Sequence, residues 1–448
     1  MPKEGTARFV TGSIPGHVLR MTGASAVGLM AIFVGELANI LFLSMLGDVQ
    51  IVAAVGYAST VMFVMISVGI GTAISASALI APEIGTGNMA GAKRLSASVH
   101  VFAIVFSAIA GGLLWAFVPE LMTLLGASGR THELATSYLR VLLPFATLMS
   151  LGMCSSAVLR SQGDARRSMN VTLVGAFVNV ALDPLFIFVF NLGIHGAAWA
   201  TNISRLAVVA AGIYWLVRTH DLIEWPRWRA LIADGPTILR FAVPATVTNL
   251  ATPIANTYVT YAIASHGNDA VAAWALIGRI SPVAFGAIFA LSGAVGPVLG
   301  QNLGARQWDR VQRAFDVSIW TAVGFTALAW AALAIAVEPL IGVFHATGET
   351  AALLRVYCVY ISPLFVFLGL LFVSNAALNA LGHPHWPTVL NWGRATLGTV
   401  PVVTLGSYLY GPTGVITANL AGASVFALTG VWLCRKLIRE KMEKSAGG

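Results

Sequence analysis

The strongest constraint on this chain is a series of about twelve long apolar runs, which short links rich in Gly, Pro and charged residues separate. A helix that crosses a bilayer needs about 20 largely apolar residues, and each run is long enough. Of the 448 residues, 57% are hydrophobic and 10% are charged, which leaves too few charged side chains to cover a water-soluble globule of this size. We therefore expect an all-α polytopic membrane protein with twelve transmembrane helices.

The basic residues predict how these helices are oriented. If both termini are cytoplasmic, most of the 26 Lys and Arg residues fall in cytoplasmic segments, whereas Arg130 falls in an outer loop. This asymmetry follows the positive-inside rule, so the net charge of +8 needs no nucleic-acid partner. The first apolar run is long enough to stay in the bilayer, which argues against a cleaved signal peptide. We expect a multi-pass protein of the plasma membrane, in a bacterium the inner membrane, with both termini cytoplasmic.

The second half of the chain repeats short motifs of the first half, with Gly, Pro and Asn at matching positions, at a shift of roughly 217 residues. Segments 37–39 and 254–256 both end in Ala-Asn, and segments 193–202 and 411–419 match as well. Six spans per repeat is an even number, so the halves are expected to be related by a pseudo-two-fold axis along the membrane normal. This predicts an N-terminal lobe over 1–218, a cytoplasmic interlobe linker over 219–236, and a C-terminal lobe over 237–448 with a basic cytoplasmic tail. The linker is either an amphipathic segment at the membrane interface or a solvated connection.

Asp183 stands beside Pro184 inside an apolar run. An acid at the centre of a spanning helix costs roughly 2.5–3.5 kcal/mol, so a chain that carries one usually uses it. Counting inward from the outer end of each span, at about 1.5 Å per residue, places several other polar residues at a similar depth. The candidate proton or cation site is Glu36, Asn39, Tyr138, Asn179, Asp183, Thr201 and Arg205.

Two uses of Asp183 are open at this point. Burial and a neighbouring carboxylate favour the neutral form of an acid, so Glu36 and Asp183 together are suited to bind and release a proton, and a metal cation is the other ligand of such a site. Alternatively, Arg205 forms an ion pair with Asp183, and the acid is then ionised and structural.

The second half of the chain offers no equivalent acid. Its spans contain Arg279 and Arg394 together with Asn256 and Asn375, which we take as candidate residues of a substrate cleft. The two arginines would favour neutral or anionic cargo there, or else they bond to helix carbonyls. Three cysteines, Cys154, Cys358 and Cys434, fall within spans and predict neither disulfides nor a metal site.

Several motifs, taken together, resemble the multidrug and toxic compound extrusion (MATE) family over nearly the whole chain. They are LRSQGD at 159–164, ALDPLFIF around Asp183, GxxGAAxAT at 193–201, and the short motifs that the two halves share. The resemblance implies two six-helix bundles that face each other across a cleft, and export of organic compounds in exchange for H⁺ or Na⁺.

The resemblance also implies roles for single residues. Asn179, Asp183 and Thr201 match the N-lobe cation site of prokaryotic members, and Tyr138 is similar to the tyrosine that lines it. Where the family pattern has an Asp in the first helix, this chain has Asn39, with Glu36 one turn earlier. Acidic C-lobe positions of the sodium-coupled branch are occupied by Asn256 and Asn375.

We therefore expect a non-enzymatic secondary antiporter that exports organic compounds or drugs by alternating access, coupled to inward flow of H⁺. The expected partners are a small organic substrate and the lipid bilayer, the protein is expected to be a monomer, and no cofactor is expected besides the coupling ion. One alternative is Na⁺ coupling with the cation on Asp183, and another is a flippase for a lipid-linked or polar precursor. An enzyme or a channel is disfavoured because the catalytic and selectivity-filter motifs are missing from the sequence.

Overall fold

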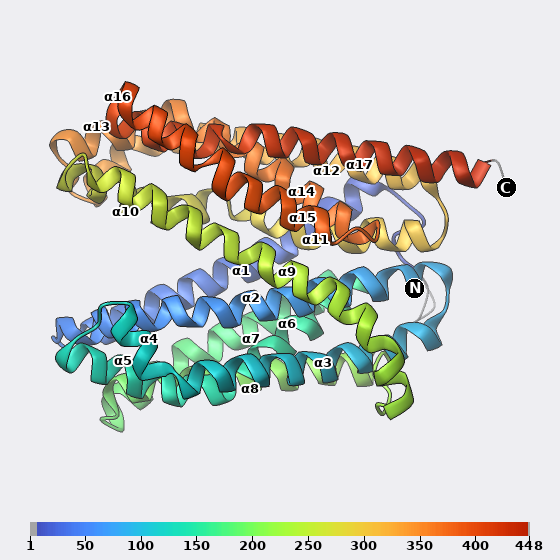
Figure 1. Cartoon of the computed structure of the whole chain (residues 1–448). Coiled ribbons are helices and arrows are strands. Elements are labelled where there is room, and N and C mark those ends of the chain that lie inside the picture. The colour runs from blue at the N-terminus through green and yellow to red at the C-terminus, as the bar shows by residue number, and fades with distance from the viewer. Residues whose placement is uncertain (1–6, 447–448) are drawn as a thin grey trace. The chain divides into compact units, whose positions relative to one another are not determined.

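The computed structural model describes residues 7–446, and every regular element among them is a helix (Figure 1). The extreme chain ends, which the sequence predicts to be cytoplasmic, lie outside the described residues. Within residues 7–446, ten helical stretches are long and apolar enough to cross a membrane, and the bent pair α10 and α11 adds an eleventh. The fold class predicted from the sequence is confirmed.

The twelfth span becomes visible in the last stretch, His385–Ser445, which is 61 residues long. It folds back at Gly411, whose φ of 58° lies in the left-handed region that favours glycine. Gly406 packs against the carbonyl of Gly414, and Gly398 packs against that of Gly422. Such contacts are those of antiparallel neighbours on either side of a turn, so this stretch is two spans.

Close contacts divide the chain into two compact units, which we call unit 1 and unit 2. Unit 1 contains Val27–Thr246, and unit 2 contains Phe9–Ala26 and the chain from Val247 onward. The helices up to the interlobe linker are α1 (Ile14–Ser44), α2 (Val49–Thr86), α3 (Met89–Ala116), α4 (Val118–Leu124), α5 (Gly129–Leu142), η1 (Leu143–Phe145), α6 (Ala146–Ser161), α7 (Ala165–Pro184), η2 (Leu185–Val189) and α8 (Gly193–Arg218). The helices after the linker are α9 (Trp228–Ala264), α10 (Asn268–Ala284), α11 (Gly286–Gly304), α12 (Trp308–Val343), α13 (Gly348–Val356), η3 (Tyr357–Ile361), η4 (Ser362–Leu364), α14 (Phe365–Ala380), α15 (His385–Gly393), η5 (Arg394–Gly398), α16 (Val400–Ala421) and α17 (Ala423–Ala446).

This division differs from the expected lobes, 1–218 and 237–448, at two segments. The segment 9–26 belongs to unit 2, because the backbone N–H of Phe9 donates to Oε1 of Gln301 at 2.8 Å and its carbonyl accepts from Nη2 of Arg310 at 2.7 Å. The linker and the first part of α9 belong to unit 1, where Asp234 accepts from Oγ of Ser98 at 2.7 Å. Helix α1 is therefore shared by both units.

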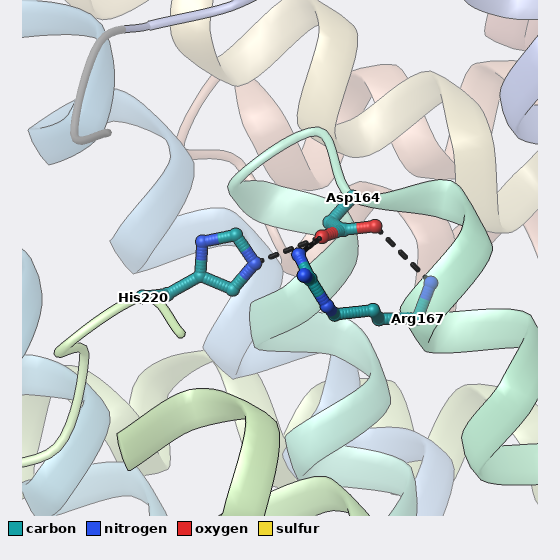
Figure 2. A network of polar contacts seen from close by, with 3 residues as sticks. All are labelled: Asp164, Arg167 and His220. Carbon is teal, nitrogen blue, oxygen red and sulfur yellow. Dashed lines mark hydrogen bonds and ion pairs between the residues drawn. The ribbon is translucent and has the colours of Figure 1, made fainter. Parts of the chain in front are cut away.

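The first residues of the interlobe linker are docked on unit 1, whereas Trp225 and Trp228 are exposed. Figure 2 shows Asp164, which caps α7 by accepting from the backbone N–H of Arg167 at 3.1 Å. The same carboxylate accepts from Nη1 of Arg167 at 2.6 Å and lies 2.9 Å from Nε2 of His220 in the linker. Leu222, two residues further on, is fully buried. The linker thus joins the first turn of α7 to the end of α8.

In both units, a tryptophan side chain bonds to a backbone carbonyl at a helix broken by proline. Pro144 and Pro363 lack an N–H, so the carbonyls four residues earlier, those of Arg140 and Val359, lose their helical donors. Trp115 donates its Nε1–H to the carbonyl of Arg140 at 3.3 Å, and Trp330 donates to that of Val359 at 2.8 Å. Each break is a short 3₁₀ turn, η1 or η4. The internal repeat predicted from the sequence is therefore present in three dimensions.

Candidate cation site

Asp183 lies where α7 changes its helical period. The helix ends at Pro184 and continues as the π-helix η2, in which Phe190 donates its backbone N–H to the carbonyl of Leu185. Gly196 of α8 lies against this turn, and a Cβ there would be 2.5 Å from the carbonyl oxygen of Phe186. The glycine thus lets α8 approach η2 closely. Such π-helical insertions occur often at functional sites.

The Asp183 carboxyl is completely buried, and its contact is an amide rather than a cation. Nδ2 of Asn39 on α1 donates to Oδ2 of Asp183 at 3.0 Å. The other oxygen, Oδ1, has no hydrogen-bond partner among the described residues. Asn179, one turn earlier on α7, lies near enough to interact with the carboxyl, but its buried Nδ2 lacks the geometry of a hydrogen bond. One oxygen of the buried acid is left to hold a ligand.

Arg205 does not form the ion pair with Asp183 that the sequence left open. Among the described residues, no salt bridge joins these two side chains, and Nη1 of Arg205 donates instead to the carbonyl of Leu142 at 3.3 Å. It also lies 3.4 Å from Oδ1 of Asn202, whose Nδ2 donates to the carbonyl of Val141 at 2.9 Å. Arg205 and Asn202 therefore satisfy the backbone just before the break at η1.

Asn202 was not among the residues predicted from the sequence. Pro144 is the sequence feature that could have indicated its role, because a proline in a helix leaves nearby carbonyls that need side-chain donors. Asn202 and Arg205 stand three apart on one face of α8 and supply those donors.

The remaining predicted residues of unit 1 take different positions. Tyr138 of α5 is buried and lies close enough to both Asp183 and Arg205 to interact electrostatically. Thr201 is half-buried on α8. Glu36 lies one turn before Asn39 but is exposed, and within residues 7–446 no ion pair or hydrogen bond joins it to Asp183. The structure thus gathers Asn39, Asn179 and Tyr138 around Asp183, and Arg205 lies on the other side of Tyr138 in this chain of interactions.

Unit 2 has no carboxylate at the equivalent place. Gly393 and Phe426 of unit 2 contact each other as Gly175 and Val208 do in unit 1, and this correspondence places Pro401 where unit 1 has Asp183. Arg279 and Asn256 are exposed on α10 and α9, and Asn375 is half-buried on α14. No group of three His, Cys, Asp or Glu side chains suited to a metal occurs in the part of the chain that the structure describes.

Comparison with known proteins agrees with this arrangement. The MatE family model matches residues 24–185 and 244–404, once in each half. The chain belongs to the MatE family. A FAD transporter of Shewanella oneidensis is 30% identical over 407 residues, which cover 90% of each chain. The multidrug export protein MepA of Staphylococcus aureus is 24% identical, over 92% of this chain and 91% of its own. The Vibrio cholerae MATE transporter VcmN in its bent form is 25% identical and superposes with a TM-score of 0.89 over 96% of this chain and 98% of that one.

As a MatE protein, the chain is a multi-pass membrane transporter of organic compounds, and the family is one of transporters rather than enzymes. The structure shows what Asn39, which departs from the family pattern, contacts. The amide that replaces the expected first-helix acid donates directly to Asp183. A second acid at this position is therefore not needed to give Asp183 a partner.

Proposed function

We propose that this MatE protein is an antiporter of the plasma membrane that exports organic compounds in exchange for H⁺ carried on Asp183, by alternating access. The observation that carries the proposal is a fully buried carboxyl whose hydrogen bond comes from a neutral amide, Asn39. An ionised acid in this place is a buried charge without a counter-ion, which is costly. Binding a cation removes that cost, so the occupancy of Asp183 and the arrangement of its surroundings depend on each other.

A proton suits this site better than Na⁺. A proton needs one oxygen, and Oδ1 of Asp183 is buried without a hydrogen bond. Hard metal cations need several oxygen ligands around them. Asn39 presents an N–H to the carboxyl, and the exposed Glu36 adds no second carboxylate contact. We therefore favour coupling to H⁺ over coupling to Na⁺.

The driving force is adequate for one proton per cycle. A membrane potential supplies about 2.3 kcal/mol per charge per 100 mV, to which a pH gradient adds. The relatives are named for FAD and for multidrug export, which supports an organic cargo.

Transport into proteoliposomes tests the proposal. The wild-type protein should accumulate FAD or a fluorescent dye under an imposed pH gradient and not under an imposed Na⁺ gradient. Asp183→Asn should abolish this accumulation while the purified protein remains monodisperse. Glu349→Gln, which removes an exposed acid near the outer end of α13, is the matched control and should transport like the wild type. Accumulation by Asp183→Asn at the wild-type rate, or accumulation that needs Na⁺, would refute proton coupling through Asp183.

A further inference from the structure

Unit 2 contains a buried cation that neither the fold nor the cation site explains. Arg394, at the first position of η5, is 6% exposed, and its Nε is buried without a hydrogen bond. Its contact to a neighbouring helix is a long one, from Nη2 to Oγ1 of Thr252 on α9 at 3.4 Å. No carboxylate forms a salt bridge with it among the described residues. A guanidinium inside a membrane span is normally paired, because an unpaired one is expensive.

The main chain around Arg394 is held firmly. Oγ1 of Thr399 donates to the carbonyl of Arg394 at 2.9 Å, which closes the π-helical turn. Gly393 and Gly398 pack directly on the ring of Phe426, and a Cβ at either glycine would lie within 3 Å of that ring. The arginine is therefore presented by a rigid backbone, as a preorganised binding group requires.

Thr252, the residue that Arg394 reaches, belongs to a polar stripe on α9. At 100° per residue, Asn249, Thr252, Asn256 and Thr260 fall on one face of this helix. Thr252, Asn256 and Thr260 are exposed. Exposed amides and hydroxyls in the middle of a spanning helix face water or a ligand rather than lipid. The stripe thus leads along α9 to the edge of the guanidinium.

The chemistry of this arrangement specifies its ligand. Acids of unit 2 lie near the ends of its helices, for example Asp269, Asp309 and Glu349, so the middle of the unit is uniformly cationic or neutral. A guanidinium with an unused N–H and a neighbouring hydroxyl matches phosphate or carboxylate oxygens, which it binds in a planar, charge-assisted manner. It disfavours a cationic drug at the same place.

We propose that Arg394, with Thr252 and the polar stripe of α9, binds the anionic group of the cargo, and that the cargo class includes aromatic compounds that carry phosphate. This inference rests on the proposed export function and names its cargo. FAD, which a relative of this chain transports, has this chemistry and serves as the probe.

Equilibrium binding to the purified protein in nanodiscs, without any gradient, tests the inference. FAD is compared with riboflavin, which has the same ring system and no phosphate, through the fluorescence of the flavin. Wild-type protein should bind FAD more tightly than riboflavin. Arg394→Gln should weaken FAD binding by about tenfold or more, equivalent to about 1.4 kcal/mol, and leave riboflavin binding unchanged. Arg394→Lys should retain part of the preference, because it keeps the charge but loses the planar set of donors.

Arg355→Gln is the matched control, since it removes a cation of the same unit that is already paired with Glu338 at 2.7 Å. It should bind both flavins like the wild type. Equal affinity of the wild type for FAD and riboflavin overturns the inference, as does wild-type FAD binding by Arg394→Gln. Neither result touches the proposed function, which fails instead if the wild type accumulates no compound under a pH gradient.

Discussion

The two units place opposite ionisable groups in the same span of the repeat. In unit 1, the buried acid Asp183 lies two residues before the π-helix η2; in unit 2, the buried base Arg394 begins the π-helix η5, at a position that corresponds to Ala176 of unit 1. Both units also break a helix at a repeated proline, Pro144 or Pro363, and there a tryptophan donates to the carbonyl that the proline leaves without a helical donor. The repeat therefore gives both units the same helix breaks, and substitutions at two different positions leave a buried acid in unit 1 and a buried base in unit 2.

The largest contrast concerns two buried arginines with the same substitution. Arg205 satisfies the carbonyl of Leu142 and Oδ1 of Asn202, so Arg205→Gln should leave both without a donor and destabilise the protein by about 2–3 kcal/mol. Arg394 has only the long contact to Oγ1 of Thr252, so Arg394→Gln removes a buried charge without a counter-ion and should leave stability unchanged or raised. Thermal unfolding in detergent measures both variants. Equal destabilisation by the two would contradict the distinction between a structural and a ligand-binding arginine.

A second contrast lies at the turn before each π-helix-bearing span. Gly163 and Gly382 end the preceding helices with the same left-handed turn, but Asp164 follows in unit 1 and His383 in unit 2. Burial raises the pKa of the Asp164 carboxyl, but the hydrogen bonds from His220 and Arg167 outweigh burial and hold that pKa well below its usual range. Asp164→Asn should therefore cost about 2 kcal/mol at neutral pH.

The pH dependence of that cost follows from the sign of the shift. A carboxyl whose pKa is lower in the folded protein stabilises it at pH values above the pKa in the unfolded chain, which is about 4. This contribution disappears as the pH falls further. The difference in melting temperature between wild type and Asp164→Asn should be full at pH 7 and shrink below about pH 4. Asp221→Asn, which breaks the exposed pair with Lys93, is the control and should change stability by less than about 1 kcal/mol. A difference that stayed constant into acid would show that Asp164 acts without its charge.

Asn39 of unit 1 and Asn256 of unit 2 stand at matching positions of the repeat and are expected to have different roles. Asn39 supplies the hydrogen bond to Asp183, and loss of a bond to a charged group costs about 1.5–3 kcal/mol. Asn39→Ala should reduce transport driven by the pH gradient about tenfold. It should also shift the external pH at which transport is half-maximal, whereas Asn256→Ala, at the repeated position of unit 2, should change cargo affinity without moving that pH. Identical pH profiles for both variants would mean that Asn39 does not act on Asp183.

The smallest expected effect concerns the tryptophan hydrogen bonds that both units share. Trp115→Phe and Trp330→Phe each remove one donor to a carbonyl that a proline leaves unpaired. Each should cost about 1 kcal/mol, because these bonds lie near the surface of the units. Nearly equal losses, measured by thermal unfolding, would support the equivalence of the two helix breaks, and a loss confined to one unit would argue against it.

The sequence predicted the twelve spans, the repeat and the meeting of Asn39 with Asp183, because apolar periodicity and the depth of polar residues are encoded locally. It did not predict that Arg205 bonds to backbone carbonyls, since that depends on how the helix breaks after Leu142. Asn202 was missed for the same reason. The assignment of residues 9–26 to unit 2 depends on Arg310, which donates to the carbonyl of Phe9 from a distant part of the chain, and no sequence pattern indicates such a contact.

Proton release during cargo binding tests the central role of Asp183 most directly. In a weakly buffered solution with a pH-sensitive dye, binding of cargo to the wild-type protein should release close to one proton per cargo molecule bound, because the two occupy the transporter alternately. Asp183→Asn should bind the same cargo and release none, and Glu349→Gln should release the wild-type number. Equal proton release by Asp183→Asn and the wild type would contradict the account and place the coupling proton on another group.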